Sequence, residues 1–306
     1  MTKPAGGKKG AEDDVRSAAA ASPRLLAGGH RLLLLVDPEL RALPFEALPY
    51  LRANCSSVAR CPSMHMLHVA SKGRAGQAAE APSVPPTFEL GGMTYIVDPK
   101  CEGSSPEDAR GPFSPPLIPT FKSTLLNDFK DWKGLMGSPN RTPADAELMQ
   151  LVSSSSGLVF LGMGRFMSYV TPGIVSSVDL RGCELAVLLG NVNNAKAHQR
   201  QLYLDNRKSV SERSLESPMR AAELLLARGV KTVVVVTMAT TAQTNCDMLR
   251  SIFSALQGGA TVAEAVWSTL KGCVFDLDHV HSGVVVMGLP HMVAGGGGGK
   301  GGKGGK

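Results

Sequence analysis

The sequence lacks the features of disulfide-rich, membrane-spanning and zinc-finger proteins. Its six cysteines show no C-x-x-C spacing, and its longest apolar run is far shorter than a membrane span. The first 14 residues contain no apolar signal core. These absences predict reduced thiols and a cytoplasmic protein with no membrane contact. The cysteines are Cys55, Cys61, Cys101, Cys183, Cys246 and Cys273.

Motifs for nucleotides, metals and serine nucleophiles are also missing. Gly162-Met163-Gly164 begins like a dinucleotide fingerprint, but Met167 stands where a third glycine is required. No P-loop, zinc ligand set or serine-centred elbow is present. His65 and His68 have helical spacing but no nearby third ligand, so we interpret them as ordinary helix histidines. The sequence therefore predicts neither cofactor nor metal.

The basic charge is modest. The formal net charge is +6, and part of the excess comes from lysines near both chain ends. The polar stretch 191–218 carries several basic residues but only one aromatic residue, Tyr203, whereas a nucleic-acid groove interleaves more aromatics with a larger basic excess. We therefore predict a solvated loop there, and no nucleic-acid partner.

Length and composition predict one folded domain between two low-complexity ends. Residues 1–28 are rich in Ala, Gly, Ser and Lys and predict a flexible segment, while 293–306 are a Gly/Lys tail that cannot pack a core. The domain is expected to span 29–292. Such a length buries enough surface to fold without disulfides or metal.

Two apolar stretches organise this domain. Leu158–Leu161 and Leu185–Leu189 lack polar alternation, which is typical of strands covered by helices on both faces. Each ends on glycine, Gly162 with Gly164 in the first and Gly190 in the second. We therefore predict an α/β fold with a mostly parallel sheet, whose strand ends form a crevice.

These stretches resemble the caspase-like peptidases of the separase and CHAT group, in which one strand ends in Gly-His-Gly and the next in Gly-Cys. The resemblance implies a three-layer caspase-like fold. It places Met163 at the position of the histidine and Asn191 at that of the cysteine. In the family, the histidine activates the cysteine, whose thiolate attacks the scissile carbonyl.

Other motifs carry the same resemblance in the same order. The strand motifs among them are short apolar runs closed by turn residues. Together they predict buried strands at 32–36, 57–61, 94–97, 231–236 and 283–288. They also predict helices at 64–69, 219–228, 245–256 and 261–270, and one with Thr142 as its N-cap and Pro143 in its first turn. The most specific is D-x-x-L-x-x-L-P-F-E-A-L-P, from Asp37 to Pro49. Trp132 lies in a W-x-G segment and is expected to pack in the core.

The two replaced positions predict a peptidase scaffold without peptidase chemistry. The thioether of Met163 has no exchangeable proton and cannot act as a general base. The amide of Asn191 cannot be deprotonated like a thiol and cannot form an acyl intermediate. We therefore expect no catalytic residues, with Met163 and Asn191 as degenerate positions framed by Gly162, Gly164 and Gly190.

An active cysteine peptidase using another pair is the alternative. Cys183 lies eight positions before Asn191, about 26 Å along an extended strand, and is out of reach. Cys246 and His198 both follow strand ends on the crevice side and are the remaining candidates. A regulatory module that binds a cleavable motif without cutting it also stays open.

Within the group, a separase-like framework without catalytic residues resembles ciliary tetratricopeptide-repeat proteins. This resemblance implies a structural role in the central apparatus of the motile axoneme, in a cilium or flagellum. The expected partners are axonemal scaffold proteins, together with a weak contact between the Lys-rich tail and acidic tubulin tails.

Overall fold

The computed structural model describes residues 29–71, 87–103, 116–192, 195–272 and 283–294. The predicted flexible segment 1–28 and nearly all of the tail lie outside these residues. Ten strands are described: β1 His30–Leu35, β2 Cys55–Cys61, β3 Thr87–Phe88, β4 Met93–Val97, β5 Lys133–Met136, β6 Gly157–Leu161, β7 Leu185–Leu189, β8 Thr232–Val236, β9 Val284–Gly288 and β10 Val293–Ala294.

Helices connect most of these strands. They are α2 Pro49–Asn54, α3 Met64–Ser71, α4 Leu117–Phe121, α5 Asp145–Ser153, α6 Pro172–Ser177, α7 Ala195–Asp205, α8 Val210–Leu215, α9 Pro218–Ala227, α10 Ala242–Gln257 and α11 Val262–Gly272. Short 3-10 turns cover Pro38–Leu40, Phe45–Ala47, Leu90–Gly92 and Phe166–Ser168, and a π turn covers Lys122–Leu126.

Eight strands form one sheet in the order β1-β2-β9-β8-β7-β6-β4-β5, and β3 pairs with β10 in a separate two-stranded sheet. Each neighbouring pair in the main sheet is parallel except β8 and β9. The predicted mostly parallel sheet is confirmed. So are the strands expected around 57–61, 94–97, 158–161, 185–189, 231–236 and 283–288.

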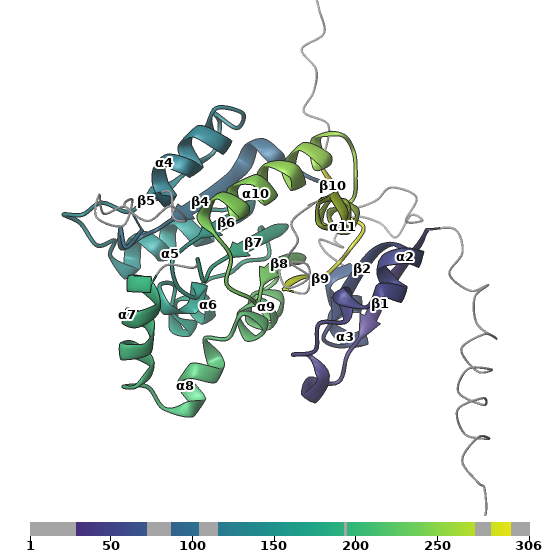
Figure 1. Cartoon of the computed structure of the whole chain (residues 1–306), viewed down its shortest axis with the longest axis horizontal. Coiled ribbons are helices and arrows are strands. Elements are labelled where there is room, and N and C mark those ends of the chain that lie inside the picture. Colours follow the sequence, from purple (N-terminus) through teal and green to yellow (C-terminus); the bar gives the residue numbers. More distant parts are fainter. Residues whose placement is uncertain (1–28, 72–86, 104–115, 193–194, 273–282, 295–306) are drawn as a thin grey trace, which may run out of the picture.

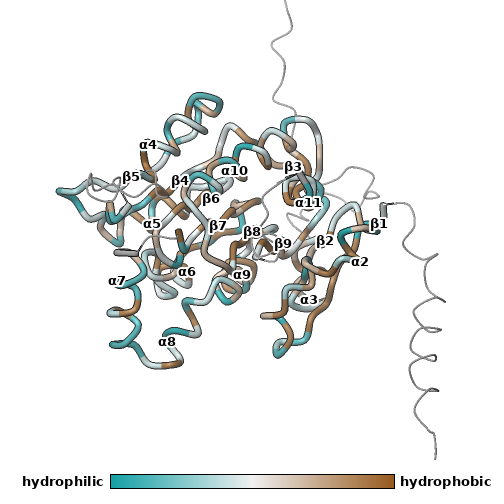
Figure 2. Tube along the Cα trace, viewed as in Figure 1, coloured by the Kyte–Doolittle hydropathy of each residue, from teal (hydrophilic) through white to brown (hydrophobic). Residues whose placement is uncertain are grey.

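Helices cover both faces of the sheet, which makes the fold three-layered (Figure 1). In β6, Val159 and Leu161 face a core formed with α4, α10 and α11, whereas Leu158 and Phe160 face a second core formed with α5, α6 and α9. This alternation buries every residue of β6. The predicted two-sided burial is thereby confirmed, and hydropathy follows it, with brown concentrated on the central strands (Figure 2).

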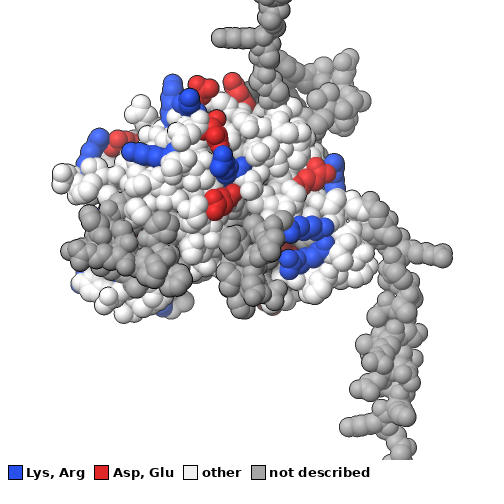
Figure 3. Space-filling view, turned by 45° about the horizontal axis from the view of Figure 1, so that its top comes forward, with Lys and Arg blue, Asp and Glu red and all other residues white. Residues whose placement is uncertain are grey.

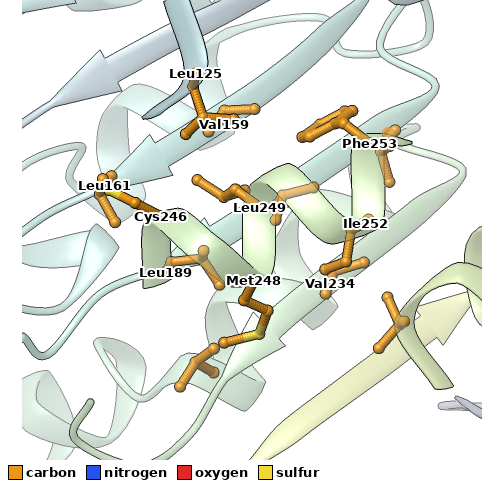
Figure 4. Packing of buried hydrophobic residues seen from close by; sticks show 14 of the residues in the cluster. Leu125, Val159, Leu161, Leu189, Val234, Cys246, Met248, Leu249, Ile252 and Phe253 are labelled. Atoms are coloured by element: carbon orange, nitrogen blue, oxygen red, sulfur yellow. The ribbon is translucent and has the colours of Figure 1, made fainter. Parts of the chain in front are cut away.

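Helix α10 supplies most of the packing on the first face. Its Leu249, Ile252 and Phe253 point toward the sheet, close to Val159 and Val234 (Figure 4). Spacing by three and four residues places these side chains on one face of the helix.

Trp132 is buried beside this helix. Its ring centroid lies 4.7 Å from that of Phe253 and 4.6 Å from that of Phe129. The indole nitrogen donates to the Leu90 carbonyl over 2.9 Å. Core packing, the predicted role of Trp132, is confirmed.

Two predictions about single elements were wrong. The strand expected to be buried at 32–36 is β1, which lies at the edge of the sheet and leaves Leu35 50% exposed, because only β2 flanks it. The helix expected to have Thr142 as its N-cap and Pro143 in its first turn begins at Asp145, with Ala144 as the N-cap and no side-chain cap. The later start places Asp145 and Glu147 in the first turn, where negative charges stabilise a helix.

The motif between Asp37 and Pro49 surrounds a buried ion pair. Arg60 on β2 and Glu46 are each about 2% exposed. The guanidinium donates to both carboxylate oxygens of Glu46 and also to the carbonyls of Arg41, at 2.7 Å, and Leu43, at 2.8 Å. Phe45 stacks on the same guanidinium, 5.2 Å from the ring centroid. The motif is therefore structural: it neutralises a buried arginine.

Candidate functional site

The ends of β6 and β7 meet at one edge of the sheet. Leu161 pairs with Leu189, so the glycines that follow are neighbours. Gly162 donates to the Leu189 carbonyl over 3.2 Å, and Asn191 donates to the Gly164 carbonyl over 3.2 Å. The two turns thus continue the pairing beyond the strands. We call Gly162, Gly164 and Gly190 the glycine frame. The structure brings together Met163 and Asn191, the two positions that this frame predicts.

Close approach of neighbouring atoms explains Gly190 and Gly162. A Cβ atom on Gly190 would lie 2.6 Å from the Gly164 carbonyl oxygen, and one on Gly162 would overlap the ring of Phe160. Asn191 itself has a left-handed backbone, with φ of +56°. Asparagine tolerates this conformation better than most residues.

The side chain of Met163 is packed into the core at this edge. It is 5% exposed and belongs to the same apolar cluster as Val192 and Ala197. Gly103 lies directly over it, because a Cβ atom there would be 2.5 Å from the Met163 sulfur. A thioether covered in this way fills space between the two strand ends and a neighbouring loop.

Asp98 holds that loop in place. Its carboxylate is fully buried and accepts hydrogen bonds from the amides of Glu102 and Gly103, each over 2.8 Å. Its own backbone is left-handed, with φ of +42°. Asp98, which follows β4 directly, therefore folds the loop 98–103 over Met163.

A buried tyrosine joins this loop to the frame. The Tyr169 hydroxyl donates to Glu102 over 2.9 Å and accepts from the Gly164 amide over 3.1 Å. Burial, and secondly the neighbouring Glu102 carboxylate, raise the pKa of Tyr169 well above its ordinary value. The phenol therefore stays protonated and acts as a structural donor. Arg200 on α7 pairs with Glu102 from the other side, at 3.2 Å.

Helices α7 and α8 occupy the segment that was predicted to be a solvated loop, so that prediction was wrong in its secondary structure. Arg165 explains part of the difference, since its guanidinium pairs with Asp205 and, at 3.0 Å, with Glu216. Ser209 and Glu212 form a reciprocal capping box at the start of α8. The S-x-x-E spacing from Ser209 to Glu212 is the sequence signal for this helix start.

We call 195–217 the cap. Gln201 on α7 reaches the frame, with its side-chain oxygen 3.0 Å from the position of a Cβ atom on Gly164. Ala197 packs in the same apolar cluster as Met163. The edge where β6 and β7 end is thus covered from two sides, by the loop 98–103 and by the cap.

Replacing Arg165 with Gln should loosen the cap without unfolding the sheet. Glu216, 8% exposed, would keep only the pair with Lys208, and Asp205 would lose its arginine. We expect amide exchange in α7 and α8 to accelerate by about tenfold or more, with β6 and β7 unchanged. Hydrogen-exchange mass spectrometry measures this. Equal acceleration of exchange in the cap and in β7 would contradict the view that Arg165 stabilises the cap independently of the sheet. Arg141→Gln, which removes an exposed ion pair, is the control.

The alternative pair, Cys246 and His198, lies in two different environments. Cys246 is fully buried on α10 and its side chain points toward Leu161 in the core (Figure 4), whereas His198 is exposed on α7. Burial, and secondly Asp247, raise the pKa of the Cys246 thiol to about 12. Such a thiol is almost entirely protonated at neutral pH and is a poor nucleophile.

Buried thiols also predict how stability depends on pH. Burial raises the pKa of Cys183, like that of Cys246, from 9.0 to about 12. The unfolded chain releases these protons near pH 9, whereas the folded chain retains them, so stability is present below pH 9 and falls as pH rises toward 12.

The measurement is a series of urea unfolding curves from neutral to alkaline pH. Between the unfolded and the folded pKa, each buried thiol should lower the free energy of unfolding by about 1.4 kcal/mol per pH unit. Cys246→Ala should unfold with a shallower pH dependence than the unchanged chain. Parallel curves for the two proteins would contradict the buried thiol.

The charged surface carries no extended area of one sign in the view of Figure 3, where acidic and basic side chains are interspersed. No helix among the described residues is both long and apolar enough to cross a lipid bilayer.

Comparison with solved structures identifies the fold class. No family model matches the chain. A crystal structure of the Saccharomyces cerevisiae separase–securin complex superposes with a TM-score of 0.59 at 17% identity, covering 85% of this chain and 15% of the solved one. A second crystal structure of that complex gives 0.53 at 16% identity, with 85% and 16% covered. The chain has the caspase-like fold of separase.

A sequence relative is more specific. The chain is homologous to part of the cilia- and flagella-associated protein 46 of Chlamydomonas reinhardtii, with 35% identity over 302 aligned positions. The alignment covers 86% of this chain but only 11% of the relative. The chain therefore corresponds to about a tenth of a much longer protein.

Proposed function

We propose that this chain is a non-catalytic interaction module built on a caspase-like peptidase scaffold. The observation that carries the proposal is the junction of β6 and β7, where the strand ends stay adjacent but present Met163 and Asn191. Neither side chain can serve as the base or the nucleophile of acyl transfer. The covered position of Met163 supports the same conclusion, because a substrate carbonyl would need the space that its thioether fills.

We further propose that the module belongs to the axoneme of a cilium or flagellum, in the central apparatus. The relative named as cilia- and flagella-associated supports the first part of this proposal. The module's part in assembly and motility is then to present a rigid surface to other axonemal scaffold proteins. Conversion of a closed peptidase fold into a scaffold requires only that the cleft be filled, because the three-layer core is independent of the catalytic pair.

The lysines of the tail, Lys300, Lys303 and Lys306, lie outside the described residues. We propose that they add a weak, salt-sensitive contact with acidic tubulin tails. Co-sedimentation with microtubules at low salt, compared between the chain and a form ending at residue 294, tests this contact. Equal co-sedimentation of the two would contradict it.

Fractionation of axonemes tests the main proposal. The tagged chain is expressed in ciliated cells, and isolated axonemes are separated into central-apparatus and outer-doublet fractions. We expect the tagged protein in the central-apparatus fraction, co-purifying with other scaffold proteins. Recovery in the detergent-soluble ciliary matrix alone would contradict an axonemal role.

A further inference from the structure

The outer edge of β1 is the least protected part of the sheet. Among the described residues, this strand is paired only with β2, and it forms the outer side of the lobe 30–71 (Figure 1). Leu32, Leu33 and Leu34 are only half-buried and Leu35 is 50% exposed, whereas all residues of β6, β7 and β8 are buried. A sequence typical of a covered strand thus lies at an open edge.

Natural edge strands usually carry features that prevent pairing with other chains. Such features are short length, an inward charge, a proline or a bulge on the strand. The opposite edge has two of them, because β5 has four residues and begins with Lys133. β1 carries the charge of Arg31 and a register irregularity between His30 and Arg31, but from Leu32 to its end at Leu35 it has neither charge nor proline. This apolar end of the strand is suited to pairing with another strand.

We infer that β1 pairs with β1 of a second copy of this chain, antiparallel across a two-fold axis. The strand, together with Val36 directly after it, is self-complementary: if Leu34 faces Leu34 of the other copy, leucine or valine faces leucine or valine at each position from 32 to 36. The same register places Arg31 of each copy opposite Asp37 of the other copy. Both side chains are exposed, Arg31 to 59%. A charged partner strand would instead place ions against leucines, which is unfavourable.

Both charged side chains also have partners within one copy. Arg31 pairs with Glu264 at 2.7 Å, and Asp37 accepts from the Glu39 amide over 3.2 Å. Because a two-fold axis makes the contact isologous, the pairing closes at two copies and removes both open edges. The resulting continuous sheet spans both molecules. A single strand edge is small for an interface, so we expect dimerisation in the micromolar range.

Sedimentation velocity of the 306-residue chain over about a hundredfold range of concentration around micromolar tests the inference. We expect a monomer–dimer equilibrium. Leu35→Lys should weaken dimerisation by about tenfold or more, since lysine protects natural edges. Val210→Lys, at a position 73% exposed on α8, is the matched control and should dimerise like the unchanged chain.

A charge exchange tests the register. Asp37→Arg alone opposes two arginines and should weaken dimerisation, whereas Asp37→Arg combined with Arg31→Asp should restore it toward the original value. A chain that stays monomeric throughout the range would overturn the inference. So would equal dimerisation of Leu35→Lys and the unchanged chain. Circular dichroism of each variant separates loss of pairing from loss of folding.

Discussion

Glu46→Ala should lower the free energy of unfolding by about 3 to 5 kcal/mol, because it leaves a buried guanidinium without its counter-charge. Arg60 is 2% exposed and would keep only two carbonyl acceptors and the ring of Phe45. Water cannot replace the lost carboxylate without opening the packing between β2 and the turn at 38–48. Urea unfolding measures the loss as a lower midpoint with an unchanged slope.

An exposed ion pair gives the control for this experiment. Arg141 and Glu147 lie 3.0 Å apart, but Arg141 is 72% exposed. Glu147→Ala should therefore change the free energy of unfolding by less than about 1 kcal/mol. Similar losses for Glu46→Ala and Glu147→Ala would show that burial of the first pair has no energetic consequence, which would contradict the structural role of the motif.

Restoring the family's reactive pair should produce no peptidase. The double variant Met163→His, Asn191→Cys places an imidazole where a thioether is 5% exposed, beneath Gly103. It also places a thiol side chain on a left-handed backbone that asparagine tolerates. We expect a loss of about 2 to 5 kcal/mol, from a poorly paired buried imidazole and from backbone strain. Peptide hydrolysis should stay at the level of the unchanged chain.

Asn191→Gly provides the matched control, since glycine adopts the positive φ freely. It should leave the free energy of unfolding nearly unchanged. Hydrolysis by the double variant, abolished when the introduced thiol is alkylated, would mean that the crevice still admits a substrate. The loop 98–103 and the cap would then not close it.

Periodicity and glycine punctuation predicted the central sheet because its strands are covered on both faces. Apolar runs such as Leu185–Leu189 have few alternatives to a buried strand, and Gly190 marks the end where backbones approach. The alignment of Met163 with Asn191 at one edge followed from the parallel order of the strands. These features depend on local sequence and on one rule of sheet topology.

The missed features depend on contacts between segments distant in sequence. The apolar composition of β1 could not reveal that only β2 flanks it. Residues 195–205 are helical partly because Arg165, 40 positions before Asp205, pairs with it. Likewise, the role of Glu46 becomes visible only when Arg60 is placed beside it. Local sequence patterns do not indicate which distant residues or strands will be in contact.

The central claim is that the crevice at the ends of β6 and β7 holds no activated thiol. A thiol-directed acyl-type probe, which reacts with an activated cysteine, tests this claim most directly. Incubated with the folded chain at neutral pH, the probe should give no stoichiometric labelling, and Cys246→Ala should leave the background unchanged. Stoichiometric labelling that disappears with Cys246→Ala would contradict a crevice without an activated thiol and would favour an active cysteine peptidase.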